Sequence, residues 1–119
     1  MKNLLISLSM LWFMLICCTA AAQGKQRKIQ TFVIEVMGNC DMCKKRIETA
    51  ALIKGVRDAK WDKLNHLLTV VYSSKVTDIE KVQAAIATAG HDTERIKAGD
   101  ETYAKLPKCC NYRGSENIH

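Results

Sequence analysis

One stretch decides the fold of this chain: Gly-Asn-Cys-Asp-Met-Cys-Lys-Lys-Arg-Ile at residues 38–47. Before it, residues 29–36 are rich in β-branched and aromatic side chains that alternate between two faces, which predicts a strand. After it, Cys43, Ile47 and Ala51 recur at helical spacing before a glycine, which is a typical stop signal. The two cysteines of the stretch therefore lie on a loop that joins a strand to the start of a helix.

The position of Cys40 and Cys43 favours the thiolate form of both side chains. Unpaired backbone N–H groups and the positive end of the helix dipole stabilise a negative charge at a helix start. The neighbouring Lys44, Lys45 and Arg46 act in the same direction. Paired thiolates on a surface loop suit a low-coordinate soft ion such as Cu(I), and a thiolate of a partner protein can then take the ion by ligand exchange.

Two other uses of the cysteine pair are open. A disulfide between Cys40 and Cys43 would close a very small ring and stabilise little. A thiol-disulfide oxidoreductase uses the same spacing at a helix start, but Asp41 and Met42 are not the residues that thioredoxin-like proteins place between their cysteines. Such proteins also need a proline that faces the pair, and Pro107 lies beyond the last predicted strand. We expect a metal-binding protein and not an enzyme, with no reaction on an organic substrate.

The first 22 residues predict a secretory signal peptide. Lys2 precedes a largely apolar run, and residues 20–22 are alanines that offer a cleavage site. An uncleaved anchor is the alternative, although the apolar run is short for a membrane span. We expect cleavage near Ala22 and a periplasmic or secreted location, in which disulfides can form. The cysteines left after cleavage are Cys40, Cys43, Cys109 and Cys110.

Charge and length limit the classes of partner. The 119 residues give room for one domain, and the formal net charge is +6. The basic residues are dispersed and aromatic residues make up only 6% of the chain, which excludes a nucleic-acid surface with stacking side chains. The cluster Lys44, Lys45 and Arg46 instead predicts docking to a protein partner with an acidic face.

The remaining elements complete the order strand, helix, strand, strand, helix, strand. Residues 56–62 and 67–72 predict two strands, and the short connection between them predicts an antiparallel hairpin. Thr77 and Glu80 predict a capping box at the start of the second helix. Residues 93–97 are short and charged, as expected of an edge strand. The predicted fold is α+β, a ferredoxin-like βαββαβ sandwich with an antiparallel sheet and two helices on one face.

Residues 99–119 predict a tail that carries two further cysteines. Its apolar residues are sufficient for docking onto the domain. The chain between Lys97 and Cys109 spans roughly 36 Å when extended, and the last strand leads only about 17–20 Å away from the cysteine loop. Cys109 and Cys110 can therefore reach Cys40 and Cys43 and complete a three- or four-thiolate site, which suits Zn(II) or a copper cluster. Disulfides and free thiols in the tail are the alternatives.

These motifs resemble the heavy-metal-associated domain of small copper chaperones, copper-transporting P-type ATPases and periplasmic mercury-binding proteins. The resemblance covers residues 28–98. It rests on Gly-Asn-Cys-Asp-Met-Cys at 38–43, Val-Val-Tyr at 70–72 and Ala-Gly-His-Asp at 89–92. The family usually has a methionine where Gly38 stands. The resemblance implies a chaperone or scavenger for Cu(I), with Hg(II), Zn(II) or Cd(II) as alternatives, and a metal-transport or metal-receiving protein as partner.

The resemblance also draws attention to His91. In similar copper chaperones this position varies, and a histidine there acts as a third ligand or tunes the thiolates. A solvated histidine in a turn is the alternative. The resemblance further allows a metal-bridged dimer. The choice of metal, and the choice between chaperone, scavenger and sensor, are not decided by the sequence.

Overall fold

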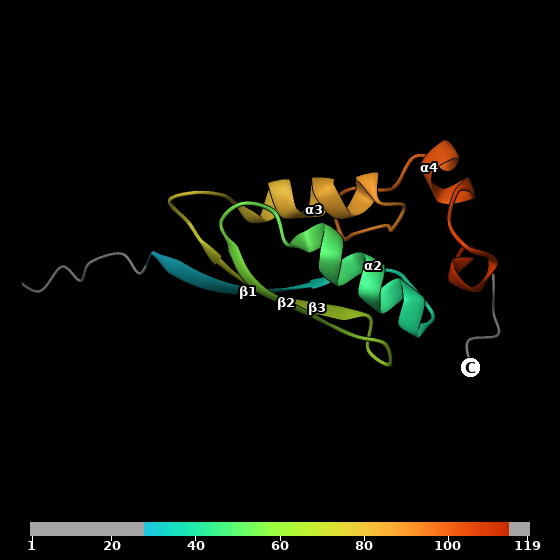
Figure 1. Ribbon diagram of the computed structural model, residues 1–119, viewed down its shortest axis with the longest axis horizontal. Coiled ribbons are helices and arrows are strands. Elements are labelled where there is room, and N and C mark those ends of the chain that lie inside the picture. Colours follow the sequence, from blue (N-terminus) through green and yellow to red (C-terminus); the bar gives the residue numbers. More distant parts are fainter. Residues whose placement is uncertain (1–27, 115–119) are drawn as a thin grey trace, which may run out of the picture.

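The computed structural model describes residues 28–114, in which two helices cover one face of an antiparallel sheet (Figure 1). The ferredoxin-like α+β class predicted from the sequence is confirmed. The predicted signal peptide at residues 1–22 lies outside the described residues. Among residues 28–114 there is no helix of the length and apolarity needed to cross a membrane. The elements are β1 (Ile29–Glu35), α2 (Asp41–Ala51), β2 (Val56–Asp62), β3 (Leu67–Ser73), α3 (Ile79–Thr88), α4 (Asp100–Ala104) and the 3-10 turn η2 (Lys108–Cys110).

The sheet has the order β1-β3-β2, and both pairings are antiparallel. The predicted hairpin of β2 and β3 is present, with Trp61 opposite Leu68 in its register. Alternating side chains of the strands point toward the helices, because successive residues of a strand face opposite sides of the sheet. The buried core between the sheet and the helices includes Ile34, Val36, Cys43, Ile47, Ala51, Ala59, Trp61, Leu68, Val70, Tyr72, Val82 and Ile86.

The predicted fourth strand at residues 93–97 is wrong in extent, since only an isolated bridge between Val36 and Thr93 forms. The amide and the hydroxyl of Thr93 both donate to the carbonyl of Ile96, at 2.8 and 3.0 Å. The Thr93 amide and the Ile96 carbonyl are bonded to each other in this turn, so neither is available for pairing with a neighbouring strand. The bridge still brings the segment beside the end of β1, where the Met37 amide donates to the Asp92 carbonyl at 2.9 Å.

Helix α3 begins one residue later than the predicted capping box requires. The capping residue is Asp78, whose carboxylate accepts from the Lys81 amide at 2.9 Å. Thr77 is buried instead, and the Glu80 carboxylate pairs with Arg95. A carboxylate at this position suits the positive end of the helix dipole, so the helix still has a polar cap at its start.

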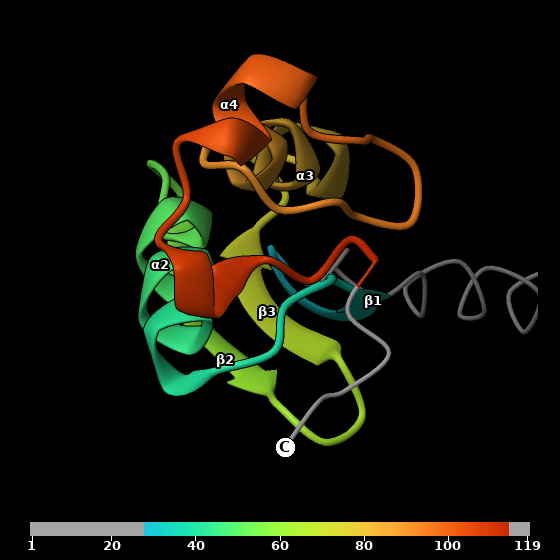
Figure 2. The same ribbon diagram turned by 90° about the vertical axis from the view of Figure 1, so that its right-hand side faces the viewer.

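The chain after residue 98 folds back onto the domain. Figure 2 shows α4 beside the end of α3, and η2 beside the start of α2. Leu106 is buried, and its side chain lies so close to Gly90 that a Cβ on this glycine would come within 2.9 Å of it. The apolar residues of the tail therefore dock onto the domain, as expected from the sequence.

Trp61 fills the space beneath the cysteine loop. Its side chain is only 1% exposed, and its Nε1 donates to the carbonyl of Val36 at 2.9 Å. A Cβ on Gly38 would lie 3.1 Å from two ring atoms of Trp61 and from the Cβ of Cys43. The indole ring thus occupies the space that a side chain at position 38 would need, which explains the glycine at this position.

We expect Gly38→Ala to destabilise the domain by about 1–3 kcal/mol, because the extra methyl group overpacks the contact with Trp61. The free energy of unfolding in urea measures this. Gly99→Ala is the matched control, since a Cβ there meets only the Thr102 hydroxyl at 3.8 Å. Equal unfolding midpoints for the two variants would show that the space beneath the loop is not tightly filled.

Candidate metal centre

Cys40 is the capping residue at the start of α2. Its backbone is extended, with φ −143° and ψ 172°, and its Sγ accepts from the Cys43 amide at 3.4 Å. A sulfur atom thus takes the place that a serine or aspartate oxygen usually takes at a helix start. Cys43 lies in the first turn, is fully buried, and donates through its Sγ to the Asn39 Oδ1 at 3.4 Å.

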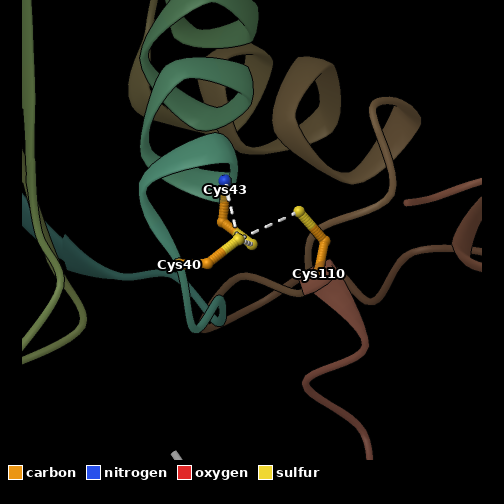
Figure 3. A group of neighbouring side chains, drawn as sticks. All are labelled: Cys40, Cys43 and Cys110. Carbon is orange, nitrogen blue, oxygen red and sulfur yellow. Dashed lines mark hydrogen bonds between the residues drawn. The ribbon is translucent and has the colours of Figure 1, made fainter. Parts of the chain in front are cut away.

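A third sulfur atom comes from the tail. The Sγ of Cys40 lies 3.2 Å from that of Cys43 and 3.5 Å from that of Cys110, and the three ligand atoms all lie within 4.8 Å of one another. Figure 3 shows the three side chains pointing toward one common point from α2 and from the tail. All three are free cysteines. Three sulfur atoms around an ion at bonds of about 2.3 Å would be about 4 Å apart, so small shifts suffice for trigonal coordination.

The three thiols differ in their tendency to ionise. Burial acts to raise the pKa of Cys40, but hydrogen bonds from the thiol and amide of Cys43 and from the tail thiols outweigh it, and the pKa is lowered. Burial raises the pKa of Cys43, with Asn39 and Cys110 acting in the opposite direction. Burial and the hydrogen bonds to Cys43 and Cys40 raise the pKa of Cys110. Of the three thiols, that of Cys40 therefore ionises most readily.

The position of Cys110 is fixed by a network around Arg113. The Arg113 guanidinium donates to both carboxylate oxygens of Asp92, at 2.7 and 3.1 Å, and also to the Ala98 carbonyl at 2.7 Å. It lies 4.4 Å from the ring centre of Tyr103. Burial acts to raise the pKa of Asp92, but the hydrogen bonds from Arg113 and the Ala98 amide hold it below its ordinary value.

Tyr112 joins the tail to the turn after α3. Its hydroxyl donates to the Gly90 carbonyl at 2.8 Å and accepts from the Asp92 amide at 2.9 Å. Its ring stacks on His91, with 5.5 Å between the ring centres. Burial raises the pKa of Tyr112 to about 12, so its hydroxyl keeps the proton that it donates.

His91 lies outside the group of three sulfur atoms. It is fully buried, and its Nδ1 is 2.8 Å from the Met37 carbonyl, which can only accept. Burial lowers the pKa of His91, so the neutral ring carries its proton on Nδ1 and leaves Nε2 as a buried acceptor. In this structure His91 supports the loop before Cys40, and it is Cys110 that lies beside the thiol pair.

Cys109 and the basic cluster occupy the surface around the thiols. Cys109 is exposed, and its Sγ lies 3.8 Å from the Sδ of Met42. The Nζ of Lys44 is bound to the Trp61 carbonyl at 2.7 Å and to Glu48 at 3.1 Å, and Arg46 donates to the Ala89 carbonyl. Lys45 is exposed. Of the three basic residues, Lys44 and Arg46 are thus engaged within the domain.

Sequence reasoning missed the groups that hold the tail in place. The apolar residues of the tail predict docking, but nothing in the sequence pairs Arg113 with Asp92. The two residues are 21 positions apart, and no periodicity links them. Asn39 was also missed, although it lies directly before Cys40; its amide reaches the Asn111 carbonyl at 3.3 Å and so connects the loop to the tail.

We expect Asp92→Asn to free the tail and expose Cys110. Losing a charged hydrogen bond costs about 1.5–3 kcal/mol, which corresponds to a rise of roughly 10–100-fold in the rate at which iodoacetamide modifies Cys110. Mass spectrometry measures this in a Cys109→Ser background, which leaves one tail thiol. The control is Asp100→Asn, because Asp100 also pairs with Arg113 but is fully exposed. An unchanged rate in Asp92→Asn would mean that other contacts hold the tail.

The same ion pair predicts how tail docking depends on pH. The folded-state pKa of Asp92 lies below its ordinary value of 3.8. The contribution of the Asp92–Arg113 ion pair to tail docking is therefore fully present above pH 3.8. It is lost as the pH falls through the lower pKa of the folded state. The Ala98 amide donates to Asp92 Oδ1 at 2.8 Å, so its NMR chemical shift follows the carboxylate. We expect this shift to stay constant from neutral pH to about pH 4, to change below it, and to show no such transition in Asp92→Asn.

Residues 34–92 match the heavy-metal-associated domain family. Among solved structures, a CopZ metallochaperone is 27% identical, with a TM-score of 0.52, and the match covers 54% of this chain and 98% of the other. A copper binding domain from HMA7, a P-type ATPase, is 26% identical, with a TM-score of 0.52, and the match covers 54% of this chain and 89% of the other.

A third solved structure shares the fold. Oxidized MerP from Ralstonia metallidurans is 24% identical, with a TM-score of 0.53, over 56% of this chain and 94% of the other. No protein of curated function gives a significant match. The family match ends at residue 92, so the tail that supplies Cys110 lies outside it.

Proposed function

Because residues 34–92 of this chain are a heavy-metal-associated domain, we propose that the protein binds a soft metal ion, foremost Cu(I), through Cys40, Cys43 and Cys110. The observation that carries the proposal is the set of three free sulfur atoms within 4.8 Å of one another. Thiolates select soft ions over Mg²⁺ and Ca²⁺, which prefer oxygen ligands. The ion is the cargo of the protein and keeps its oxidation state on binding.

The number of sulfur atoms bears on the choice of ion. Structural Zn(II) sites take four ligands in a tetrahedron, and only three ligand groups gather at this point among the described residues. Cu(I) and Hg(II) accept lower coordination by thiolates, so we rank them above Zn(II) and Cd(II). The similarity to a CopZ metallochaperone and to a copper binding domain of an ATPase supports copper as the first choice.

Ligand exchange is the proposed route of transfer. Cys40 is the partly exposed member of the three and has the lowered pKa, so it offers the first thiolate to an arriving ion. Cys43 and Cys110 then lose their protons to solvent as they join. A partner thiolate reaches the ion from the side of Cys40, and the exposed Lys45 is the free cation of the basic cluster that can meet an acidic partner.

We further propose that the mature protein acts outside the cytoplasm as a chaperone or scavenger. The predicted signal peptide supports export. In an oxidising compartment the close thiols would otherwise form a disulfide, so a bound ion also protects them. A third thiolate holds the ion more firmly than two, which favours a scavenger or a carrier whose release requires the tail to move.

Serine variants test the site at less than one equivalent of Cu(I). We expect Cys40→Ser and Cys43→Ser to lose about 1000-fold or more in affinity, and Cys110→Ser about 10–100-fold, that is, roughly 1.4–2.7 kcal/mol. Competition with a colorimetric Cu(I) chelator under anaerobic conditions measures this. Ala104→Ser, at an exposed position of α4, is the control for changes in the tail. Full affinity in the Cys40→Ser, Cys43→Ser double variant would reject the site.

The oxidoreductase hypothesis has a separate test. An enzyme of that class reduces insulin catalytically, and its activity depends on a thiolate that attacks and a second thiol that resolves the mixed disulfide. We expect the reduced protein to show no turnover beyond its own stoichiometric thiols. Multiple turnovers that disappear in Cys40→Ser would establish the enzyme in place of the metal carrier.

A further inference from the structure

Beside the three-thiol group lies a second pair of sulfur atoms, from Cys109 and Met42. Their Sγ and Sδ atoms are 3.8 Å apart. Cys109 is exposed, and the side chain of Met42 is 50% exposed. The space beneath the cysteine loop is filled by Trp61 and not by Met42. A half-exposed methionine gains little from burial, so packing does not account for its position.

The 3-10 geometry of η2 explains how neighbouring cysteines take different places. Side chains in a 3-10 helix are separated by about 120° per residue. Cys110 therefore points inward, toward Cys40 and Cys43, whereas Cys109 stays at the surface and meets Met42 in the first turn of α2. The Cys40 sulfur lies 3.5 Å from that of Cys110, and the Cys109 thiol is among the groups that lower the pKa of Cys40.

We propose that Cys109 and Met42 bind a second soft ion, with the Cys40 sulfur shared between the two ions. The inner ion is held by Cys40, Cys43 and Cys110, and the outer ion by Cys109, Met42 and the bridging Cys40. This inference rests on the proposed function, because the inner ion orders the shared sulfur. The outer site takes a monovalent soft cation, for which a thioether is a suitable ligand.

Charge favours filling both sites with Cu(I). One Cu(I) on three thiolates carries a net charge of −2, and burying such a charge is costly. The second ion arrives with one further thiolate, after Cys109 has released its proton to solvent, and Met42 adds no charge. The net charge therefore stays at −2 over a larger group of atoms, of which Cys109 and Met42 face water.

The stoichiometry of Cu(I) binding tests the outer site. The full mature chain, reduced and anaerobic, is titrated with Cu(I) and analysed by native mass spectrometry, with chelator competition for affinities. We expect two ions per monomer for the wild type and one for Cys109→Ser. Met42→Leu, which keeps the size of the side chain but removes the thioether, should weaken the second ion by tenfold or more.

Met37→Leu is the matched control, because it removes a methionine that packs beside the core and lies outside the sulfur group. It should bind two ions. The inference is overturned if the wild type saturates at one ion per monomer, if Cys109→Ser still binds two, or if the second ion occurs only in dimers. A wild type that binds no ion rejects the proposed function itself, so the two failures are distinguishable.

Discussion

The ion pair of Arg113 with Asp92 is the constraint on which the site depends. The helix α4 and the turn η2 are too short to hold a conformation alone, since isolated helices of this length are not stable in water. What fixes them is the two-pronged contact of one guanidinium with one partly buried carboxylate, together with Tyr112 and Leu106. The third sulfur atom of the site therefore owes its position to residues that are not themselves sulfur ligands.

The elements nearest the cysteine pair were predictable because their signals are local. Alternation along β1, helical spacing after Cys43 and the short connection between β2 and β3 each need fewer than about a dozen residues to be recognised. The start of α3 was misplaced by one residue, because Thr77 and Asp78 are both good caps and are neighbours in the sequence. Residues 93–97 failed as a strand because Thr93 bonds within its own turn.

The candidate site was only half predictable, for a different reason. Cys40 and Cys43 carry a motif, whereas the choice between Cys109 and Cys110 depends on how η2 turns and on contacts distant in the sequence. The length of the tail allows either cysteine to reach Cys40 and Cys43, and His91 is a further candidate for the third ligand. Burial of His91 against Tyr112 settles its place in the fold, but that burial depends on the same docked tail and has no trace in the local sequence.

Gly38 and Trp61 show that the packing beneath the cysteine loop can be achieved in more than one way within the same fold. The loop position at which the resemblance to the family predicts a methionine is a glycine here, and the indole ring of Trp61 from β2 fills the space below it. The absence of a side chain at position 38 and the large ring of Trp61 are complementary in volume, so neither residue alone predicts how the loop is supported. A substitution toward the usual family pattern at one of them would require a compensating loss of volume at the other.

The separation of Cys40 and Cys110 along the chain has a mechanical consequence. Their sulfur atoms are 70 residues apart in sequence, with almost the whole domain between them. An ion shared by both would close that span as a removable cross-link and restrict the unfolded chain as a disulfide does. Loading would then be reported by the resistance of the protein to heat and proteases, so that empty carriers would be degraded first and filled ones retained.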